Sequence, residues 1–215
     1  MPLPRRTILL PAALAAVALA GCSIGDDGPQ TTQARDVAAF TQLNNEDSVD
    51  VRLHVGEPQS VRVLAGEKVI DRVGTEVRDG TLHLTFDRDG LGGDDVIVEA
   101  SVPKLTGIKA SGSGDIDVDG IDQDAFEVLS DGSADITLEG TAGRIALDVD
   151  GSGDVDLADL KARDAEVFVG GSGDVDVRAD DRLEVSVDGS GDVRYHGDPA
   201  LTQHLDGSGD LSQVN

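Results

Sequence analysis

The stretch Gly-Ser-Gly-Asp-Val-Asp-Leu at 151–157 decides the fold, because the chain repeats it at nearly constant spacing. Related stretches start at Gly112, Gly132, Gly151, Gly171, Gly189 and Gly207. The steps between them are 20, 19, 20, 18 and 18 residues. Such self-similarity is the signature of a solenoid, in which each repeat is one structural unit that stacks on the next.

Apolar and polar residues alternate on both sides of each Gly-Ser-Gly-Asp corner. Before the corner at 189–192 the apolar residues are Leu183, Val185 and Val187, and Val193 follows it. Alternation with a period of two is typical of a strand with one buried face. Each repeat is therefore expected to contain a strand, the corner, a second strand and a variable turn.

These repeats predict an all-β protein, a parallel β-helix of 18–20-residue coils. A chain that returns after one coil places equivalent residues one strand spacing apart, about 4.8 Å. Val149, Val169 and Val187 should then stack inside the coils, and Ile121 and Leu160 in the variable turns should fill a third, shorter side. Two glutamines interrupt the apolar columns in the last coil, as is typical of a polar cap.

The Gly-Ser-Gly-Asp corner is interpreted first as a bend. Glycine permits positive φ and close backbone approach, and Ser and Asp side chains bond to nearby backbone amides. Stacking of the corners places six carboxylates in one column: Asp115, Asp135, Asp154, Asp174, Asp192 and Asp210.

Calcium is the alternative interpretation of this column. Like charges at strand spacing repel, and a hard cation with oxygen ligands would relieve the repulsion. The phrase is similar to the glycine-aspartate nonapeptide of calcium-binding β-rolls, but that motif needs a glycine-rich corner on both sides of each coil. The opposite turns here have no such consensus, so solvated corner aspartates without a cofactor are the favoured interpretation.

The N-terminus predicts export. Residues 1–21 have a basic start with Arg5 and Arg6, then an apolar run too short to span a membrane, so they are expected to be a signal peptide. Leu-Ala-Gly before Cys22 resembles a bacterial lipobox, which implies cleavage before Cys22 and acylation of its sulfur. The basic start also loosely resembles a twin-arginine signal. Residues 22–35 are polar, with Gly and Pro, and are expected to be a tether.

The mature chain divides into two β-rich parts. Residues 36–110 contain alternating stretches such as SVDVRLHV and TLHLTF, and RDGT at 78–81 is a hairpin signal. Residues 111–215 carry the repeats. The first part is expected either to form early coils of the same helix or to be a separate β layer that caps it.

The order of these motifs resembles the bacterial family described as "putative auto-transporter adhesin, head GIN domain". The resemblance covers residues 36–213 and depends on the strand at Phe40, VRDGTLHL, the VPKL step at 102–105 and the repeating Gly-Ser-Gly-Asp. It implies a right-handed β-helix on an exported, often lipid-anchored surface protein. Because no outer-membrane barrel follows the repeats, autotransport is not expected of this chain.

Charge and motifs limit the function classes. The net charge is −25, from 42 acidic and 17 basic residues, so nucleic acid is not expected as a partner. No nucleophile elbow, metal-binding histidine pair or phosphate loop is present in the sequence. We therefore expect a non-enzymatic, lipid-anchored scaffold or interaction module on the extracytoplasmic face of the cell membrane, with Cys22 as the membrane anchor and an unknown envelope or protein partner.

Two alternatives stay open from the sequence. The first is a calcium-binding, β-roll-like surface module. The second is a polysaccharide-acting enzyme, because some parallel β-helices cleave acidic polysaccharides with basic residues beside a long groove. The basic residues that could serve in this role are scattered: Lys161, Arg163, Arg178, Arg182 and Arg194.

Overall fold

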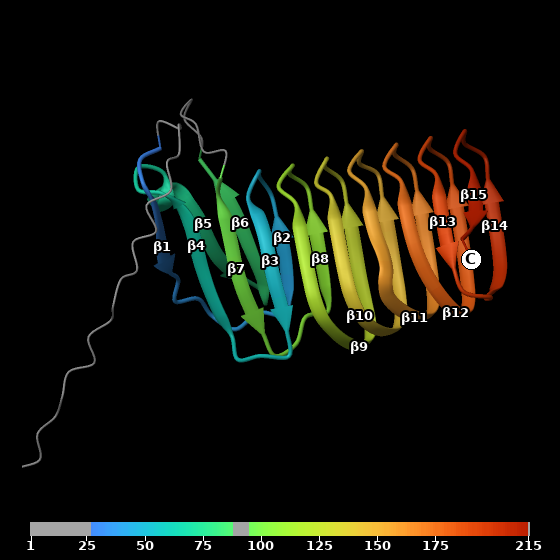
Figure 1. The fold of residues 1–215 in the computed structure, drawn as a ribbon, viewed down its shortest axis with the longest axis horizontal. Coiled ribbons are helices and arrows are strands. Elements are labelled where there is room, and N and C mark those ends of the chain that lie inside the picture. Colours follow the sequence, from blue (N-terminus) through green and yellow to red (C-terminus); the bar gives the residue numbers. More distant parts are fainter. Residues whose placement is uncertain (1–26, 88–94, 215) are drawn as a thin grey trace, which may run out of the picture.

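The fold is a parallel β-solenoid built from one continuous, folded-over sheet (Figure 1). The computed structural model describes residues 27–87 and 95–214, so the predicted signal peptide and Cys22 lie outside the described residues. Within these two ranges no helix is long and apolar enough to cross a membrane.

The N-terminal part contains eight strands and one short 3₁₀ helix, and the repeats contain the rest. The first part comprises β1 (Gln30–Ala34), β2 (Gln42–Asn45), β3 (Asp50–Val55), β4 (Ser60–Gly66), η1 (Ile70–Arg72), β5 (Val73–Arg78), β6 (Thr81–Phe86), β7 (Ile97–Val102) and β8 (Gly107–Ala110). The repeats comprise β9 (Ile116–Ser130), β10 (Ile136–Val149), β11 (Val155–Val169), β12 (Val175–Val187), β13 (Val193–His196), β14 (Ala200–Leu205) and β15 (Leu211–Gln213).

The predicted stacking of the coils is confirmed. Strands β9 to β12 pair in parallel, and Val149 aligns with Val169, which aligns with Val187. All three valines are completely buried. The alternating apolar side chains therefore form columns that run along the interior of the solenoid and exclude water, which is the main stabilising term for coils that cannot bury a face alone.

The variable turns differ from the prediction, because most of them are bent strands and not loops. Strand β9 continues through its turn for 15 residues without a break. Register shifts between Thr137 and Gly140, and between Leu157 and Ala162, mark the bends. Pairing continues around this edge between β9 and β10 but skips residues 158–161 of β11 against β12, and Leu160, which belongs to the bend, is buried as expected.

The corner glycines also differ from the prediction in one respect. The described glycines with positive φ lie elsewhere, for example Gly120 and Gly140 in the bends, so the corners do not depend on left-handed backbone. The corners depend instead on the close approach of the backbones of successive coils. A Cβ at Gly171 would lie 2.0 Å from the carbonyl oxygen of Gly151 in the coil below, and one at Gly189 would lie 2.0 Å from that of Gly171.

The bend divides the solenoid into two outer faces. We call the side formed by β1, β4, β7, β3, β13, β15 and the first halves of β9–β12 the β3 face. We call the side formed by β5, β6, β2, β8, β14 and the second halves of β9–β12 the β8 face.

The N-terminal part joins the solenoid in both of the ways that the sequence left open. Strand β2 pairs in parallel with β6 and with β8, so the first coil along the chain lies between two later ones, as the colours of Figure 1 show. Strands β4 and β5 then pair antiparallel with β7 and β6 and form an antiparallel layer at this end of the stack. The early coils and the capping layer therefore belong to one sheet.

The predicted tether is wrong for its last residues. Strand β1, Gln30–Ala34, pairs antiparallel with β4 along the edge of the β3 face. Its side chains are nearly all exposed and show no apolar alternation, so the sequence carries no strand signal there. Backbone pairing with an available edge explains why this polar segment forms a strand.

The close approach at the corners makes a specific prediction. Gly171→Ala should lower the free energy of unfolding by roughly 1 to 3 kcal/mol, because the new methyl overlaps a backbone oxygen that cannot move without shifting a coil. Ser172→Ala, at the exposed next position, is the matched control and should change little. Urea unfolding measures both, and equal stability of the two variants would contradict this account of the corner.

Candidate functional site

The six aspartates predicted as a column do form one, and they bond directly to one another's backbone. The Asp135 N–H donates to Asp115 Oδ1 at 3.1 Å, and the Asp154 N–H donates to Asp135 Oδ1 at 2.9 Å. The same bond, at 2.9 Å each time, continues through the remaining members: Asp174, Asp192 and Asp210. We call this chain of hydrogen bonds the aspartate ladder.

A seventh aspartate, Asp50, extends the ladder and was missed from the sequence. The Asp115 N–H donates to Asp50 Oδ1 at 3.1 Å. Asp50 lies in a corner that reads Glu-Asp-Ser-Val-Asp and lacks the glycines on which the repeat was aligned. The signal that could have found it is the following Val51 and Leu53, which match the pair of apolar residues that follows the corners before the last coil.

The ladder explains the aspartates without a ligand. Each Oδ1 from Asp50 to Asp192 accepts a backbone N–H that a sheet ladder leaves free at the corner. The close carboxylates repel one another. Burial, and next the charge of Asp115, raise the pKa of Asp50, and the hydrogen bond from the Asp115 N–H lowers it by less. The calcium alternative stays a prediction, since the ladder does not use the second carboxylate oxygens, although that of Asp174 lies 3.5 Å from an Arg194 nitrogen.

Two substitutions of Asp154 separate the ladder from a calcium site. Asp154→Asn keeps an Oδ1 acceptor for the Asp174 N–H and removes one repelling charge, so it should be at least as stable as the wild type. Asp154→Ala removes the acceptor and should cost about 1 kcal/mol. Thermal unfolding with chelator measures the two values.

The same experiment with millimolar calcium tests the alternative. A cation that binds the native state must raise the melting temperature. The ladder account predicts no shift in the wild type. A shift that both variants lose would show that the carboxylates act as metal ligands.

A second candidate site is a groove on the β8 face. Outward-facing residues of neighbouring strands form a row in which Gln42, Gly107, Glu127 and Ala146 follow one another in register. Gly107 has no side chain and Ala146 has only a methyl, so the surface is hollowed on either side of Glu127. The two hollows have volumes of about 320 and 540 Å³ and share Gln42 and Glu127. We call them together the Glu127 groove.

The Glu127 groove collects hydrogen-bonding groups of both kinds. Gln42, Asn44 and Thr81 line the first hollow, and the Oδ1 atom of Asn44 is buried without a hydrogen-bond partner among the described residues. Lys104 and Arg144 line the second hollow. Because both donors and acceptors line the groove, it suits a ligand with many hydroxyl groups, which donate and accept at the same atoms.

Most of the basic groups at the groove are already paired. Lys109 Nζ lies 2.7 Å from Asp131 Oδ2, and Arg144 pairs with Glu166. The groove is therefore close to neutral on a strongly acidic protein. Sequence reasoning did not find it, because the signal is the coincidence of two small outward residues, in β8 and β10, on either side of Glu127 in β9, and this requires the register.

Next to the Glu127 groove, Asp148 lies on the β8 face between two outward-facing apolar residues. Leu129 and Phe168 flank it in the neighbouring strands of the β8 face. Burial by these neighbours, and then the charges of Asp150 and Asp131, raise the pKa of Asp148. Its Oδ1 atom is buried and has no hydrogen-bond partner in the described part of the chain.

The raised pKa predicts a pH-dependent effect of Asp148→Asn. The folded state binds the Asp148 proton more tightly than the unfolded state, so ionisation of Asp148 destabilises the fold at neutral pH. Asp148→Asn should raise the free energy of unfolding at pH 7 by no more than about 1 kcal/mol, since solvent partly screens the half-buried carboxylate.

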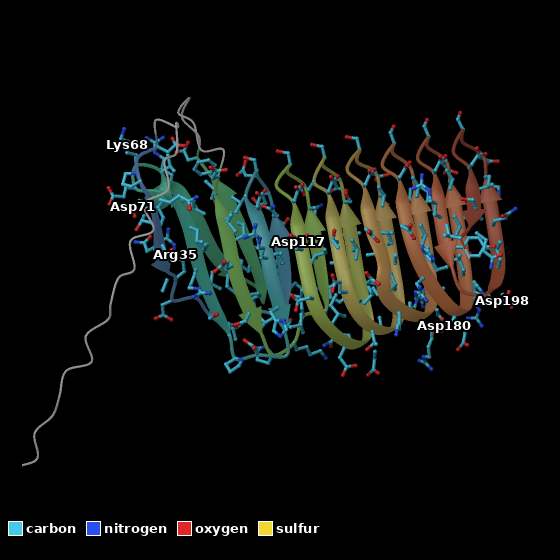
Figure 2. All side chains as sticks on the ribbon, viewed as in Figure 1. Arg35, Lys68, Asp71, Asp117, Asp180 and Asp198 are labelled. Atoms are coloured by element: carbon cyan, nitrogen blue, oxygen red, sulfur yellow. The ribbon has the colours of Figure 1, made fainter. Side chains whose placement is uncertain are left out.

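This gain should disappear as the pH falls through the ordinary aspartate range, near about 3.9. Urea unfolding at several pH values measures it. Asp198→Asn, on an exposed bend (Figure 2), removes the same charge and is the control. A gain that is independent of pH would contradict the assigned cause.

The basic residues of the enzyme alternative are not gathered by the fold. Arg182 lies 3.9 Å from Asp164, Arg194 lies 3.5 Å from Asp174, and Arg178 donates to the Ala158 carbonyl oxygen at 2.9 Å. None of the five residues named from the sequence lines the Glu127 groove. Figure 2 shows side chains distributed along the length of both outer faces.

One further cluster was not predicted. Asp188, His204 and Asp206 place one potential ligand atom each within 4.8 Å of one another. His204 Nε2 lies 3.0 Å from Asp206 Oδ2. All three side chains are exposed, and such acidic groups are commonly solvated, so the cluster identifies no metal site by itself.

The fold and its surface define a parallel β-solenoid with an apolar interior and candidate binding features on its outer faces. The chain matches the family described as "Putative auto-transporter adhesin, head GIN domain" over residues 39–199. It belongs to this family, as the sequence resemblance indicated. A comparison with curated proteins finds no match.

Solved structures of similar proteins have the same fold. A "putative adhesin" from Bacteroides fragilis NCTC 9343 has a TM-score of 0.69 at 21% identity, over 86% of this chain and 97% of that one. A "putative lipid binding protein" from Parabacteroides distasonis ATCC 8503 has a TM-score of 0.58 at 21% identity, over 89% and 98% of the two chains. A "putative adhesin" from Parabacteroides merdae ATCC 43184 has a TM-score of 0.56 at 18% identity, over 89% and 98%.

Proposed function

We propose that this protein is a non-enzymatic, lipid-anchored surface module that binds hydroxyl-rich polysaccharide of a cell envelope through the Glu127 groove. The observation that carries the proposal is the position of Glu127 between Gly107 and Ala146. It creates two adjoining hollows on an otherwise regular sheet, and a chain of sugar units could lie across both.

The polarity of the groove supports a neutral ligand. Glu127 is exposed and forms no ion pair within residues 27–87 and 95–214, so it is free to accept from hydroxyl groups. Gln42 and Asn44 add planar amides, and Leu129 adds an apolar wall. A polyanion would meet the net charge of −25 on approach, which disfavours it.

The proposed anchor is Cys22, and the proposed location is the extracytoplasmic face of the cell membrane. The support is the resemblance of Leu19-Ala20-Gly21-Cys22 to a lipobox, together with membership of a family that is described as adhesins. Acyl chains on Cys22 would hold the solenoid at the membrane, because two or more chains anchor firmly where one does not.

A filled groove tests the binding proposal. Gly107→Val places two methyl groups in the first hollow, and its Cβ would lie 3.0 Å from the Glu127 carbonyl oxygen, a tight contact that a small backbone shift must relieve. We expect the wild type to bind members of a glycan array and purified cell-wall polysaccharide, and Gly107→Val to bind at least about tenfold more weakly. Thermal unfolding checks that the variant is folded.

Thr137→Val is the control, because it places a valine at an outward position of the β3 face, where it replaces only a hydroxyl with a methyl. It should bind as the wild type does. Binding that survives in Gly107→Val, or no glycan binding by the wild type, would contradict the proposal.

Cys22→Ser tests the anchor. When cells are labelled with an alkyne fatty acid, the wild type should carry the label and sediment with membranes, and Cys22→Ser should do neither. Label on Cys22→Ser, or an unlabelled wild type, would contradict lipidation at this residue. Neither result bears on the groove, so the two parts of the proposal fail separately.

A further inference from the structure

The coil formed by residues 196–214 is the least protected part of the solenoid. All six residues of β14 are exposed. Among the described residues, the large apolar side chains that are exposed all lie in this coil: Leu201 at 38%, Leu205 at 39% and Val214 at 37%. Leu201 and Leu205 continue the buried columns of Leu183 and Val187, so they are core residues without a cover.

Both edge strands of this coil have a free side. Within residues 27–87 and 95–214, strand β14 pairs only with β12, and β15 pairs only with β13. Their outer backbone N–H and C=O groups are available to another strand. The opposite end of the solenoid has a covered core. Val69, which precedes η1, and Ile70, its first residue, pack against the core there, with exposures of 1% and 5%.

The sequence of β14 is self-complementary. Leu201, Gln203 and Leu205 are its inward positions, since they align with Leu183, Val185 and Val187. If two β14 strands pair antiparallel about Gln203, Leu201 of each copy lies opposite Leu205 of the other. The two Gln203 amides then face each other, where each can donate to the other.

The charges favour this antiparallel arrangement. From Ala200 to Leu205 the strand contains no Asp, Glu, Lys or Arg, in a chain with 42 acidic residues. A twofold axis through Gln203 reverses the strand direction of the second copy. The corner edge of one copy, which carries the aspartate ladder, then meets the bend edge of the other copy, near Gly197. The two Asp210 carboxylates therefore lie at opposite edges of the contact and do not repel each other directly.

We propose that this coil binds the same coil of a second copy, so that two solenoids join end to end through antiparallel β14 strands. The contact covers Leu201 and Leu205 and completes the backbone hydrogen bonds of both edges. It is independent of the Glu127 groove and would place two grooves on one assembly.

Sedimentation equilibrium of the purified protein tests the proposal. The wild type should show a monomer–dimer equilibrium that strengthens with added salt, because salt screens the repulsion between two acidic copies. Leu205→Asp should weaken dimerisation at least about tenfold, because a buried leucine is replaced by a charge. Thr32→Asp, in the exposed edge strand β1 at the other end, should leave the dimer unchanged.

Disulfide trapping provides a second measurement if Leu205→Asp alters folding. In a Cys22→Ser background, Gln203→Cys should form a covalent dimer on mild oxidation, and Thr32→Cys should not. A wild type that stays monomeric at all concentrations and salt levels would overturn the proposal. Equal trapping of the two cysteine variants would overturn it as well.

Discussion

The structure depends on the approach of successive coils at the Gly-Ser-Gly-Asp corner. There the backbone of one coil contacts the backbone of the next, with a carbonyl oxygen where a Cβ would stand, as between Gly151 and Gly171. This contact fixes the register, and the register places the valine columns inside and the aspartate ladder outside. Interior packing, edge hydrogen bonds and the pattern of surface charge all follow from it.

The candidate binding features of the described residues lie on the outer surface. The apolar columns between the two sheets are buried, and the corner aspartates use an oxygen each to satisfy the backbone. The outward-facing residues of each face differ from one coil to the next. On the β8 face the succession of Gly107, Glu127 and Ala146 produces a groove that combines acceptors and donors. A regular scaffold thus supports a local site at little cost to its own stability.

The sequence predicts the repeated part of this fold well, because its period and alternation record contacts between neighbouring coils. Val149, Val169 and Val187 were placed from spacing alone. The features that it missed depend on contacts that produce no periodic pattern in the sequence. They are Asp50, in a corner without glycine, and the position of β2 between β6 and β8. The polar strand β1 is a third, because it joins the sheet through its backbone hydrogen bonds to β4. The Glu127 groove needs the register of β8 with β9 and β10, which residues far apart in the sequence determine.

The central claim is that the solenoid is a sum of equivalent, in-register coils, and deletion of one coil tests it most directly. Removal of residues 151–170 joins Asp150 to Gly171 and leaves every remaining residue in phase. This variant should fold and unfold cooperatively, with a lower free energy of unfolding, since one set of neighbour contacts is lost. Removal of 151–160 alone shifts all later residues out of phase and should prevent folding of the repeats. Circular dichroism during urea unfolding measures both, and a half-coil deletion as stable as the whole-coil deletion would contradict the account.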